Sequence, residues 1–468
     1  MILRVLGHFA LVSLFAFAAA PVSRAAAANP DAMAKEALSL LADYIRIDTT
    51  NPPGNEIRAA EFFKAIFDRE GIESQIFESA PGRASIYARL KGDGSKKAIV
   101  LMNHMDVVPV DKRYWTVDPF AGVIKDGYIW GRGALDMKSM GILELMAFLT
   151  LKREGTPLKA DVIFLGTADE EAGGLLGAGY MVKEHFDLFA NAGTVLNEFG
   201  FIPLDDNGKV RYYGAYVSEK TPFWLHLTAT GTPGHGSRPG PDSAVIRLIE
   251  ALHRIVAYQT PLKVEQGVQD FYADTADLEP DATKRARLKD LRNSIKDPAF
   301  AAEFTKGRGD NAVVRNTIAI TMLEGSSKVN VIPPEASARL DVRLLPSQNP
   351  DEFLAELKKV IADDTIKVEP IISFPPSSSP RDSEFFRILQ SVATANDPGV
   401  KVTTPMLTGF TDCHFFREKG IPCFGFIPLK VNVKELGSVH GNDERLPVDT
   451  LSFGTRVMHE IVKRLATQ

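Results

Sequence analysis

The stretch Ala98-Ile-Val-Leu-Met-Asn-His-Met-Asp-Val-Val-Pro109 decides the fold, because it joins a continuous apolar run to polar groups that can bind a ligand. Residues 98–103 have the pattern of a strand buried on both faces, which is typical of a parallel sheet covered by helices. His104 and Asp106 follow at the carboxyl end of this strand, where open α/β sheets place their ligands. A histidine there can give one ring nitrogen to a metal while a carboxylate orients the other. Taken alone, the pair favours a surface-loop histidine with a nearby acid.

Strand and helix patterns alternate on both sides of this stretch. Strands are predicted at residues 85–90, 161–166 and 194–196, and helices at residues 37–47, 57–70, 137–154 and 174–184. The pattern resumes from residue 351, with helices at 351–362, 383–395 and 448–465 and a strand at 423–427. This βαβα order predicts an α/β fold with a mostly parallel sheet covered by helices.

The pattern changes near Tyr212. Residues 223–230, 316–324 and 336–344 alternate as half-exposed strands do, and residues 243–258 have a helical pattern. We therefore predict a smaller α+β lid or dimerisation domain inserted into the first domain. The expected parts are the catalytic domain at residues 30–214 and 346–468 and the inserted domain at residues 215–345. Residues 264–310 form a long polar segment with short helices such as 282–295.

The first 28 residues have the pattern of a secretory signal peptide. Arg4 precedes an apolar run from Leu6 to Ala20, and small residues follow it. A membrane anchor is the alternative, but the run is shorter than the roughly 20 residues that a bilayer span needs. We expect cleavage, so that the mature protein is exported, periplasmic or secreted, and not bound to a membrane.

The composition excludes some classes of partner. The formal net charge is -5 and the basic residues are spread along the chain, so no nucleic-acid surface is indicated. Only two cysteines occur, Cys413 and Cys423, which excludes a disulfide scaffold. They can pair in an oxidising compartment or remain as buried free thiols. Neither has the spacing of a zinc site, so any metal ligands must be histidines and carboxylates.

Two further segments place carboxylates beside a predicted strand or helix. Asp136 lies between a glycine-rich loop and a helix, where it can be shared by two cations or simply cap the helix. Glu170 and Glu171 follow a buried strand, directly after another acid. Adjacent buried acids raise one another's pKa unless a cation neutralises them, so a metal is the simplest explanation.

Two more candidates complete the set. Glu198 follows a short predicted strand in Val195-Leu-Asn-Glu198, and His440 lies in the loop Gly437-Ser-Val-His-Gly-Asn442. Either residue alone could be a polar loop residue. Because both occur after four earlier candidates at strand or loop exits, we predict a dinuclear metal site.

Ordered blocks from Thr50-Asn-Pro-Pro-Gly54 to His440-Gly-Asn-Asp-Glu444 resemble the zinc-dependent metallopeptidase family twenty. This family includes bacterial glutamate carboxypeptidase, aminoacylases, acetylornithine deacetylase and succinyl-diaminopimelate desuccinylase. The resemblance covers essentially the whole mature chain. It is greatest to the carboxypeptidase S and N-acyl-amino-acid hydrolase branch, which carries a comparable insertion in its second domain.

The resemblance implies two Zn²⁺ ions, for which Co²⁺ or Mn²⁺ can substitute, with one carboxylate bridging them. The first ion is implied to bind His104, Asp136 and Glu198, and the second Asp136, Glu171 and His440. Glu170 matches the general base, and Asp106 matches the acid that supports His104. The peptide bond after Asp136 is cis in relatives.

The resemblance also implies substrate-side residues. His235 matches a histidine that, in dimeric relatives, reaches into the partner subunit's site and stabilises the reaction oxyanion. Asn330 and Arg343 match residues that hold the substrate, and an arginine can bind a carboxylate through two parallel hydrogen bonds. Gly409 and Thr411 occupy the family's substrate-side loop.

The sequence therefore predicts a dinuclear zinc-dependent amidohydrolase or metallopeptidase with Glu170 as general base. Its expected substrates are a C-terminal peptide bond or the amide of an N-acyl amino acid. A deacylase or desuccinylase of amino-acid biosynthesis is an alternative within the same chemistry, and a non-catalytic metal-dependent binding protein is an alternative of another class. A homodimer is one expected state. Residues 264–310 could extend the dimer interface or replace it.

Overall fold

The computed structural model describes residues 30–468, so the expected signal peptide at residues 1–28 lies outside the described residues. The catalytic domain is built on a six-stranded sheet with the order β1 (Ser74–Ala80), β2 (Arg83–Leu90), β6 (Val162–Thr167), β3 (Ala98–His104), β7 (Ala192–Asn197) and β17 (Cys423–Gly425). Strands β6, β3, β7 and β17 are parallel to one another, whereas β2 pairs antiparallel with both β1 and β6. The predicted α/β class is confirmed, and the apolar stretch that predicted it forms the inner strand β3.

Helices cover both faces of this sheet, as the buried pattern of β3 requires. Ile99 and Leu101 face one core and Val100 and Met102 the other, since successive side chains of a strand point to opposite faces. The first core contains α1 (Pro30–Ile45), α2 (Ile57–Arg69), α3 (Lys138–Glu154), α12 (Glu384–Asn396) and α15 (Asp449–Thr467). The second contains α4 (Ala178–Glu184) and α13 (Cys413–Arg417).

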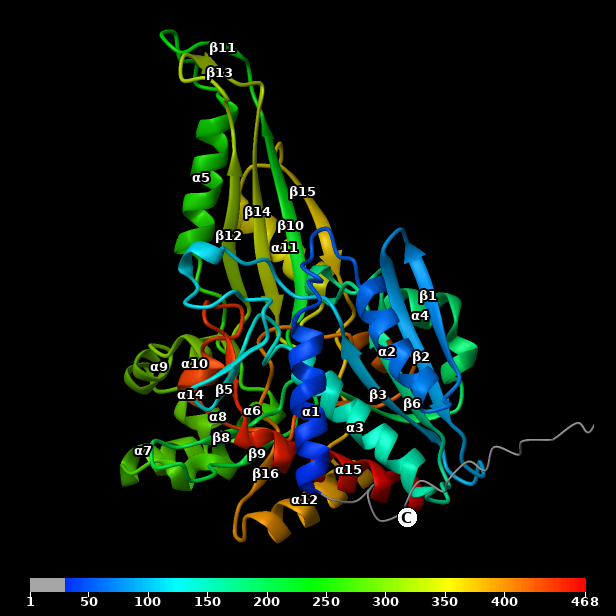
Figure 1. Cartoon of the computed structure of the whole chain (residues 1–468). Helices are drawn as coiled ribbons and strands as arrows, with labels where there is room; N and C mark the ends of the chain where they lie inside the picture. Colours follow the sequence, from blue (N-terminus) through cyan, green and yellow to red (C-terminus); the bar gives the residue numbers. More distant parts are fainter. Residues whose placement is uncertain (1–29) are drawn as a thin grey trace, which may run out of the picture.

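The inserted domain projects away from the catalytic domain (Figure 1). It is called the lid below. Its antiparallel sheet has the order β12 (Thr317–Glu324), β14 (Glu335–Leu344), β10 (Thr221–Thr230) and β15 (Lys367–Ser373). Helices α5 (Ala244–Ala257) and α11 (Pro350–Ile361) share its apolar core. The short strands β11 (Gly234–His235) and β13 (Val331–Ile332) pair at the far end of the lid.

The lid core extends beyond residue 345, where the sequence placed the return to the catalytic domain. Phe353 and Leu357 of α11 and Val368 of β15 are buried in the lid core. Strand β15 is an edge strand, and it contains Pro370, which an edge strand tolerates but which weakens the strand pattern in the sequence. The chain returns after Ser373, through the Pro/Ser-rich residues 374–380.

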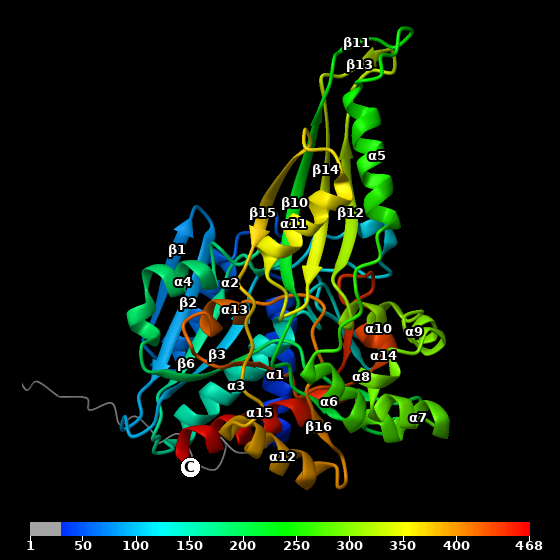
Figure 2. The same cartoon turned by 180° about the vertical axis from the view of Figure 1, so that it is seen from behind.

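Residues 266–313 contain five short α-helices. They lie beside the catalytic domain, away from the lid sheet (Figure 2). They are α6 (Gln266–Thr275), α7 (Ala282–Lys289), α8 (Leu291–Ser294), α9 (Pro298–Phe304) and α10 (Arg308–Val313). Their core includes Leu345 and Met406 from outside the segment. Within residues 30–468, no helix has the length and apolarity that crossing a membrane requires.

Candidate metal centre

Four of the expected site residues lie at one edge of the large sheet. His104 is the last residue of β3, Glu198 directly follows β7, and Glu170 and Glu171 lie in a short 3-10 turn, Glu170–Ala172, three residues after β6. Because β3, β6 and β7 are parallel neighbours, their carboxyl ends meet at this edge. The parallel register of the sheet thus brings together side chains almost 100 residues apart.

Asp136 and His440 reach the same edge from outside the sheet. Asp136 lies two residues before α3, and its peptide bond to Met137 is cis, as the resemblance implied. His440 lies in the loop that follows α14 (Val433–Leu436), with a left-handed φ of 58°. Both residues therefore depend on loop conformation for their placement.

The carboxylate of Asp136 lies between two groups of side chains. Its Oδ1 is 3.1 Å from His104 Nε2, which is also 3.6 Å from Glu198 Oε2. Its Oδ2 is 3.1 Å from His440 Nε2, which is also 3.3 Å from Glu171 Oε2. One carboxylate thus gives one oxygen to each group, which is the arrangement of a bridging ligand between two cations.

Asp106 holds the turn that carries the two adjacent glutamates. It accepts hydrogen bonds from the backbone nitrogens of Glu170 and Glu171, at 3.1 and 3.2 Å. The Nδ1 atom of His104 lies 3.0 Å from the backbone oxygen of Asp106 and 3.5 Å from its carboxylate. Asp106 therefore orients this histidine mainly through its carbonyl, and the glutamates through its side chain.

The metal cluster is the set of side chains of His104, Asp136, Glu170, Glu171, Glu198 and His440. Its electrostatics favour the binding of cations. Hydrogen bonds with Asp136 and Glu171 raise the pKa of His440 to about 10. Burial raises the pKa of Glu198 to about 8, and burial with the nearby charge of Glu198 raises that of Glu170 well above its usual value. Crowded, buried carboxylates have such raised pKa values when no cation compensates them.

Two buried carboxylate oxygens also indicate that this cluster binds cations. Among residues 30–468, Glu171 Oε1 and Glu198 Oε1 are buried side-chain oxygens without a hydrogen-bond partner. The ligand atoms of His104, Asp136 and Glu171 lie within 4.8 Å of one another, as do those of His104, Glu170 and Glu198. Imidazole nitrogens and carboxylate oxygens suit Zn²⁺, Co²⁺ and Mn²⁺ alike, so the residues present fit a pair of divalent cations.

A comparison with known families identifies the chain. The model of peptidase family M20/M25/M40 matches residues 100–464, which include every residue of this cluster. The chain belongs to this peptidase family. The family that the sequence resembled is therefore confirmed.

Relatives in peptidase family M20/M25/M40 agree over nearly the full length. Human N-fatty-acyl-amino acid synthase/hydrolase PM20D1 is 27% identical, over 92% of this chain and 88% of its own. Aminoacylase-1 of Sus scrofa is 28% identical, over 92% of this chain and 95% of its own. The M20 family metallo-carboxypeptidase of Sulfolobus solfataricus has the same fold, with a TM-score of 0.69 and 21% identity over 92% of this chain and 99% of its own. As a member of this family, the chain is a hydrolase of amide or peptide bonds.

The base of the lid carries one of the expected substrate residues close to the substrate-side loop. The guanidinium of Arg343 forms an ion pair with Asp341 at 2.6 Å and lies 5.1 Å from the ring of Phe410 and 5.7 Å from that of Trp224. Its Nη1 atom is buried and has no hydrogen-bond partner in the described part of the chain. Gly409 precedes Phe410, so the structure brings this loop and Arg343 together.

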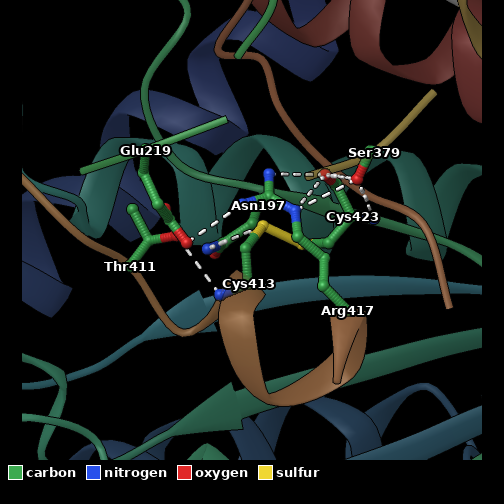
Figure 3. Close-up of a disulfide and its surroundings, with 7 residues drawn as sticks. All are labelled: Asn197, Glu219, Ser379, Thr411, Cys413, Arg417 and Cys423. Carbon is green, nitrogen blue, oxygen red and sulfur yellow. Dashed lines mark hydrogen bonds and ion pairs between the residues drawn. A yellow bond between two sulfur atoms is a disulfide. The ribbon is translucent and has the colours of Figure 1, made fainter. Parts of the chain in front are cut away.

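Thr411 faces the interior of the protein (Figure 3). Its side chain is buried and donates to Glu219 Oε2 at 2.9 Å, and it accepts from the backbone nitrogen of Cys413. Glu219 forms a buried ion pair with Arg417 at 3.0 Å. The hydroxyl of Thr411 thus supports the loop from the inside.

His235 and Asn330 lie at the far end of the lid, away from the metal cluster (Figures 1 and 2). Both are exposed, and the backbone nitrogen of Gly236 donates to the backbone oxygen of Asn330 at 2.8 Å. The Nδ1 atom of His235 lies 2.8 Å from the hydroxyl of Ser237. Within one chain, the structure brings these two residues to each other and not to the cluster.

The two cysteines form a disulfide, which decides between the two states left open by the sequence. Cys413 begins α13 and Cys423 begins β17, and both are buried. The bond therefore ties the end of the substrate-side loop to the strand that pairs with β7 (Figure 3).

Several supporting residues were missed by sequence reasoning. Asn51 donates to Asp106 at 2.8 Å and to Asp169 at 3.3 Å, and Arg83 binds both Asp169 and Glu56 at 2.7 Å. This buried network anchors the segment that leads into the two adjacent glutamates. Asn51 lies in a block that marked the family, but its partners are more than 50 residues away in sequence.

Proposed function

We propose that the chain is a dinuclear metal-dependent hydrolase that cleaves a C-terminal peptide bond or the amide of an N-acyl amino acid. The observation that carries this proposal is the Asp136 carboxylate, which gives one oxygen to the group of His104 and the other to the group of His440. The full-length similarity to N-fatty-acyl-amino acid synthase/hydrolase and to aminoacylase-1 supports the substrate class. The intact cluster favours a hydrolase over a non-catalytic binding protein.

Each protein group then has a distinct task. His104, Asp136, Glu171, Glu198 and His440 would hold two divalent cations, which would supply polarisation of the amide carbonyl and lower the pKa of a water molecule. Glu170 is buried beside His104 and Glu198, where it can accept a proton from water and pass it to the leaving nitrogen. Arg343 would bind the carboxylate of the leaving amino acid, because its Nη1 atom has no hydrogen-bond partner among residues 30–468.

The substitution Glu170→Gln tests this assignment. We expect turnover to fall about 10²–10⁴-fold, because general acid–base catalysis contributes that much, while bound Zn²⁺ stays at the wild-type level. Glu144→Gln is the matched control, since Glu144 is also a buried glutamate, lies on α3 and accepts a hydrogen bond from Asn103. Hydrolysis of a panel of dipeptides and N-acyl amino acids, with metal content measured in parallel, gives the readout. Wild-type turnover in the Glu170→Gln protein would refute the role of this residue as general base.

We further propose that the protein works as a homodimer in which His235 of one copy completes the site of the other. The exposed position of His235 at the end of the lid supports this arrangement. The lid also exposes Ile246, Ile249 and Val256 on α5 and Leu323 on the edge strand β12, so apolar surface is available for a second copy.

Mixing two inactive variants tests this dimer directly. A heterodimer of Glu170→Gln and His235→Ala chains has one site with an intact Glu170 and an intact His235 from the other chain. If His235 acts between copies, mixing and refolding the two variants restores activity. If the mixture stays inactive while light scattering shows a dimer, His235 does not act across the interface.

Export is proposed from two independent observations. Residues 1–28 have the signal-peptide pattern, and the buried Cys413–Cys423 disulfide is typical of an oxidising compartment. Cell fractionation with mass determination of the purified protein tests this proposal. A full-length protein in the cytoplasmic fraction with two free thiols would contradict it.

A further inference from the structure

Glu444 collects four hydrogen bonds from the loop that carries Asp136. Its side chain is fully buried. Its Oε1 accepts from the backbone nitrogens of Leu135 and Asp136, at 2.7 and 3.1 Å. Its Oε2 accepts from the backbone nitrogen of Gly133 at 3.0 Å and from Arg132 Nη1 at 2.6 Å. A carboxylate has about four acceptor positions, so this one is used completely.

The same residues also tie this loop to the loop of His440. Gly131 donates from its backbone nitrogen to the backbone oxygen of Glu444 at 2.9 Å. Arg132 Nη2 donates to the backbone oxygen of Gly441 at 2.8 Å, one residue after His440. Strand β19 (Arg445–Pro447) then pairs with β5 (Tyr128–Trp130), which closes the connection. The contacts of Glu444 and Arg132 therefore fix the position of Asp136 relative to His440.

We propose that Glu444 is a positioning residue that sets the geometry of the second metal site, formed by Asp136, Glu171 and His440. This inference rests on the proposed dinuclear centre. The inference goes beyond that centre because the side chain of Glu444 binds Arg132 and backbone nitrogens of the loop, and is not itself one of the proposed ligands. Its effect passes through the backbone of the loop that carries the bridging carboxylate.

The two sites should differ in their dependence on Glu444. His104 ends a strand within the buried sheet, and Glu198 directly follows another, so the two ligands that belong to the first site alone are held by the sheet register. His440 has a side chain that is 52% exposed, and it lies in a loop with left-handed backbone conformation. The second site therefore depends on loop-to-loop contacts, of which those of Glu444 and Arg132 are buried.

Glu444→Gln removes these contacts selectively. Glutamine has one acceptor oxygen and an NH₂ group, so two of the four donors would face another donor. Substitution of residues that support metal ligands lowers metal affinity by about 10–100-fold. We expect this loss for the second of two Co²⁺ ions added to metal-free protein, measured by calorimetry and visible absorption. His440→Ala serves as the reference for a lost second site.

Glu435→Gln is the matched control, because Glu435 is a buried glutamate of the same return segment. Its side chain accepts from Tyr128 and from the backbone nitrogen of Asn432, both of which lie outside the loop of Asp136. This variant should bind both ions as the wild type does. If Glu444→Gln does not fold, Arg132→Lys is the second variant. It keeps the positive charge but cannot bind both Glu444 and the backbone oxygen of Gly441 through two separate nitrogens. We expect it to weaken binding of the same second ion.

The readouts separate positioning from simple destabilisation. A positioning role predicts that the second ion weakens, that the rise in Tm on adding Co²⁺ shrinks, and that excess Co²⁺ restores turnover with KM unchanged. A purely structural role predicts a lower Tm of the metal-free protein with unchanged Co²⁺ affinities, and that result would overturn the proposal. Equal weakening of both ions would also overturn it. A wild-type protein that binds fewer than two Co²⁺ ions would overturn the dinuclear centre itself, and this inference with it.

Discussion

Removing the Cys413–Cys423 disulfide should destabilise the catalytic domain by an amount that the structure allows us to calculate. The two cysteines are 10 residues apart in sequence. The chain-entropy relation for such a short loop gives a loss of about 3 kcal/mol at 25 °C when the bond is broken. Cys413 and Cys423 are both buried, so replacing them by alanine removes two packed sulfur atoms as well. At about 1 kcal/mol for each, the double alanine variant should lose about 5 kcal/mol in total.

Urea unfolding separates these two contributions. For a slope of about 3 kcal/mol per molar urea, breaking the bond by reduction lowers the midpoint by about 1 M. The double alanine variant should unfold at a lower urea concentration still, because it also lacks the sulfur packing. The lid contains neither cysteine and is the internal control, so hydrogen exchange of β10 and β14 should be unchanged below the transition.

The same perturbation should affect substrate binding more than metal binding. Cys413 follows the loop that places Phe410 beside Arg343, whereas the cluster ligands lie on other segments. We expect a higher KM for substrates with a free carboxylate, at wild-type metal content. A midpoint that does not change on reduction, or a loss of metal with unchanged KM, would refute this reasoning.

The remaining predictions concern other parts of the site. Arg343→Met should raise KM about 10–100-fold for substrates with a free carboxylate and much less for their amides, since a hydrogen bond to a charged group contributes about 1.5–3 kcal/mol. Treatment with a chelator should abolish hydrolysis, and Zn²⁺, Co²⁺ or Mn²⁺ should restore it; full activity after complete metal removal would contradict the dinuclear centre. Burial raises the pKa of Glu144 well above its usual value. This group therefore lowers the free energy of unfolding as the pH rises above about 4.5. Glu144→Gln should therefore stabilise the protein more at pH 8 than at pH 5, as measured by urea midpoints at both values.

The sequence located part of the candidate metal cluster because three of its residues follow a local pattern that can be read without the fold. His104 ends an apolar run, and Glu170 and Glu171 follow another, so their positions at strand ends were predictable. The parallel register then places these ends at one edge, which is a general property of such sheets. Pairing of distant segments carries no such local signal, so the contacts of Asn51 and Glu444 became visible only in the structure.

The lid shows the opposite case. Its first strands alternate clearly, but Lys367–Ser373 is a short edge strand with a proline, and its assignment to the lid rests on pairing with β10. The orientation of Thr411 was also beyond the sequence, because a loop threonine can face a ligand or the interior. Its buried partner Glu219 lies 192 residues earlier, at the junction between the catalytic domain and the lid.

The base and the far end of the lid have different proposed roles. At its base, Arg343 contacts Phe410, and the same loop continues to Asp412, which accepts from Thr167 at the end of β6 at 2.8 Å. Arg343, the proposed carboxylate-binding residue, is therefore linked through this loop to the candidate ligand edge of its own chain. His235 is at the other end of the lid, where its ring contacts Ser237. In the proposed homodimer, binding of the substrate carboxylate should thus be a property of a single chain, whereas stabilisation of the transition state would use His235 of a second copy. It follows that weakening the dimer should lower kcat while leaving KM and metal content nearly unchanged.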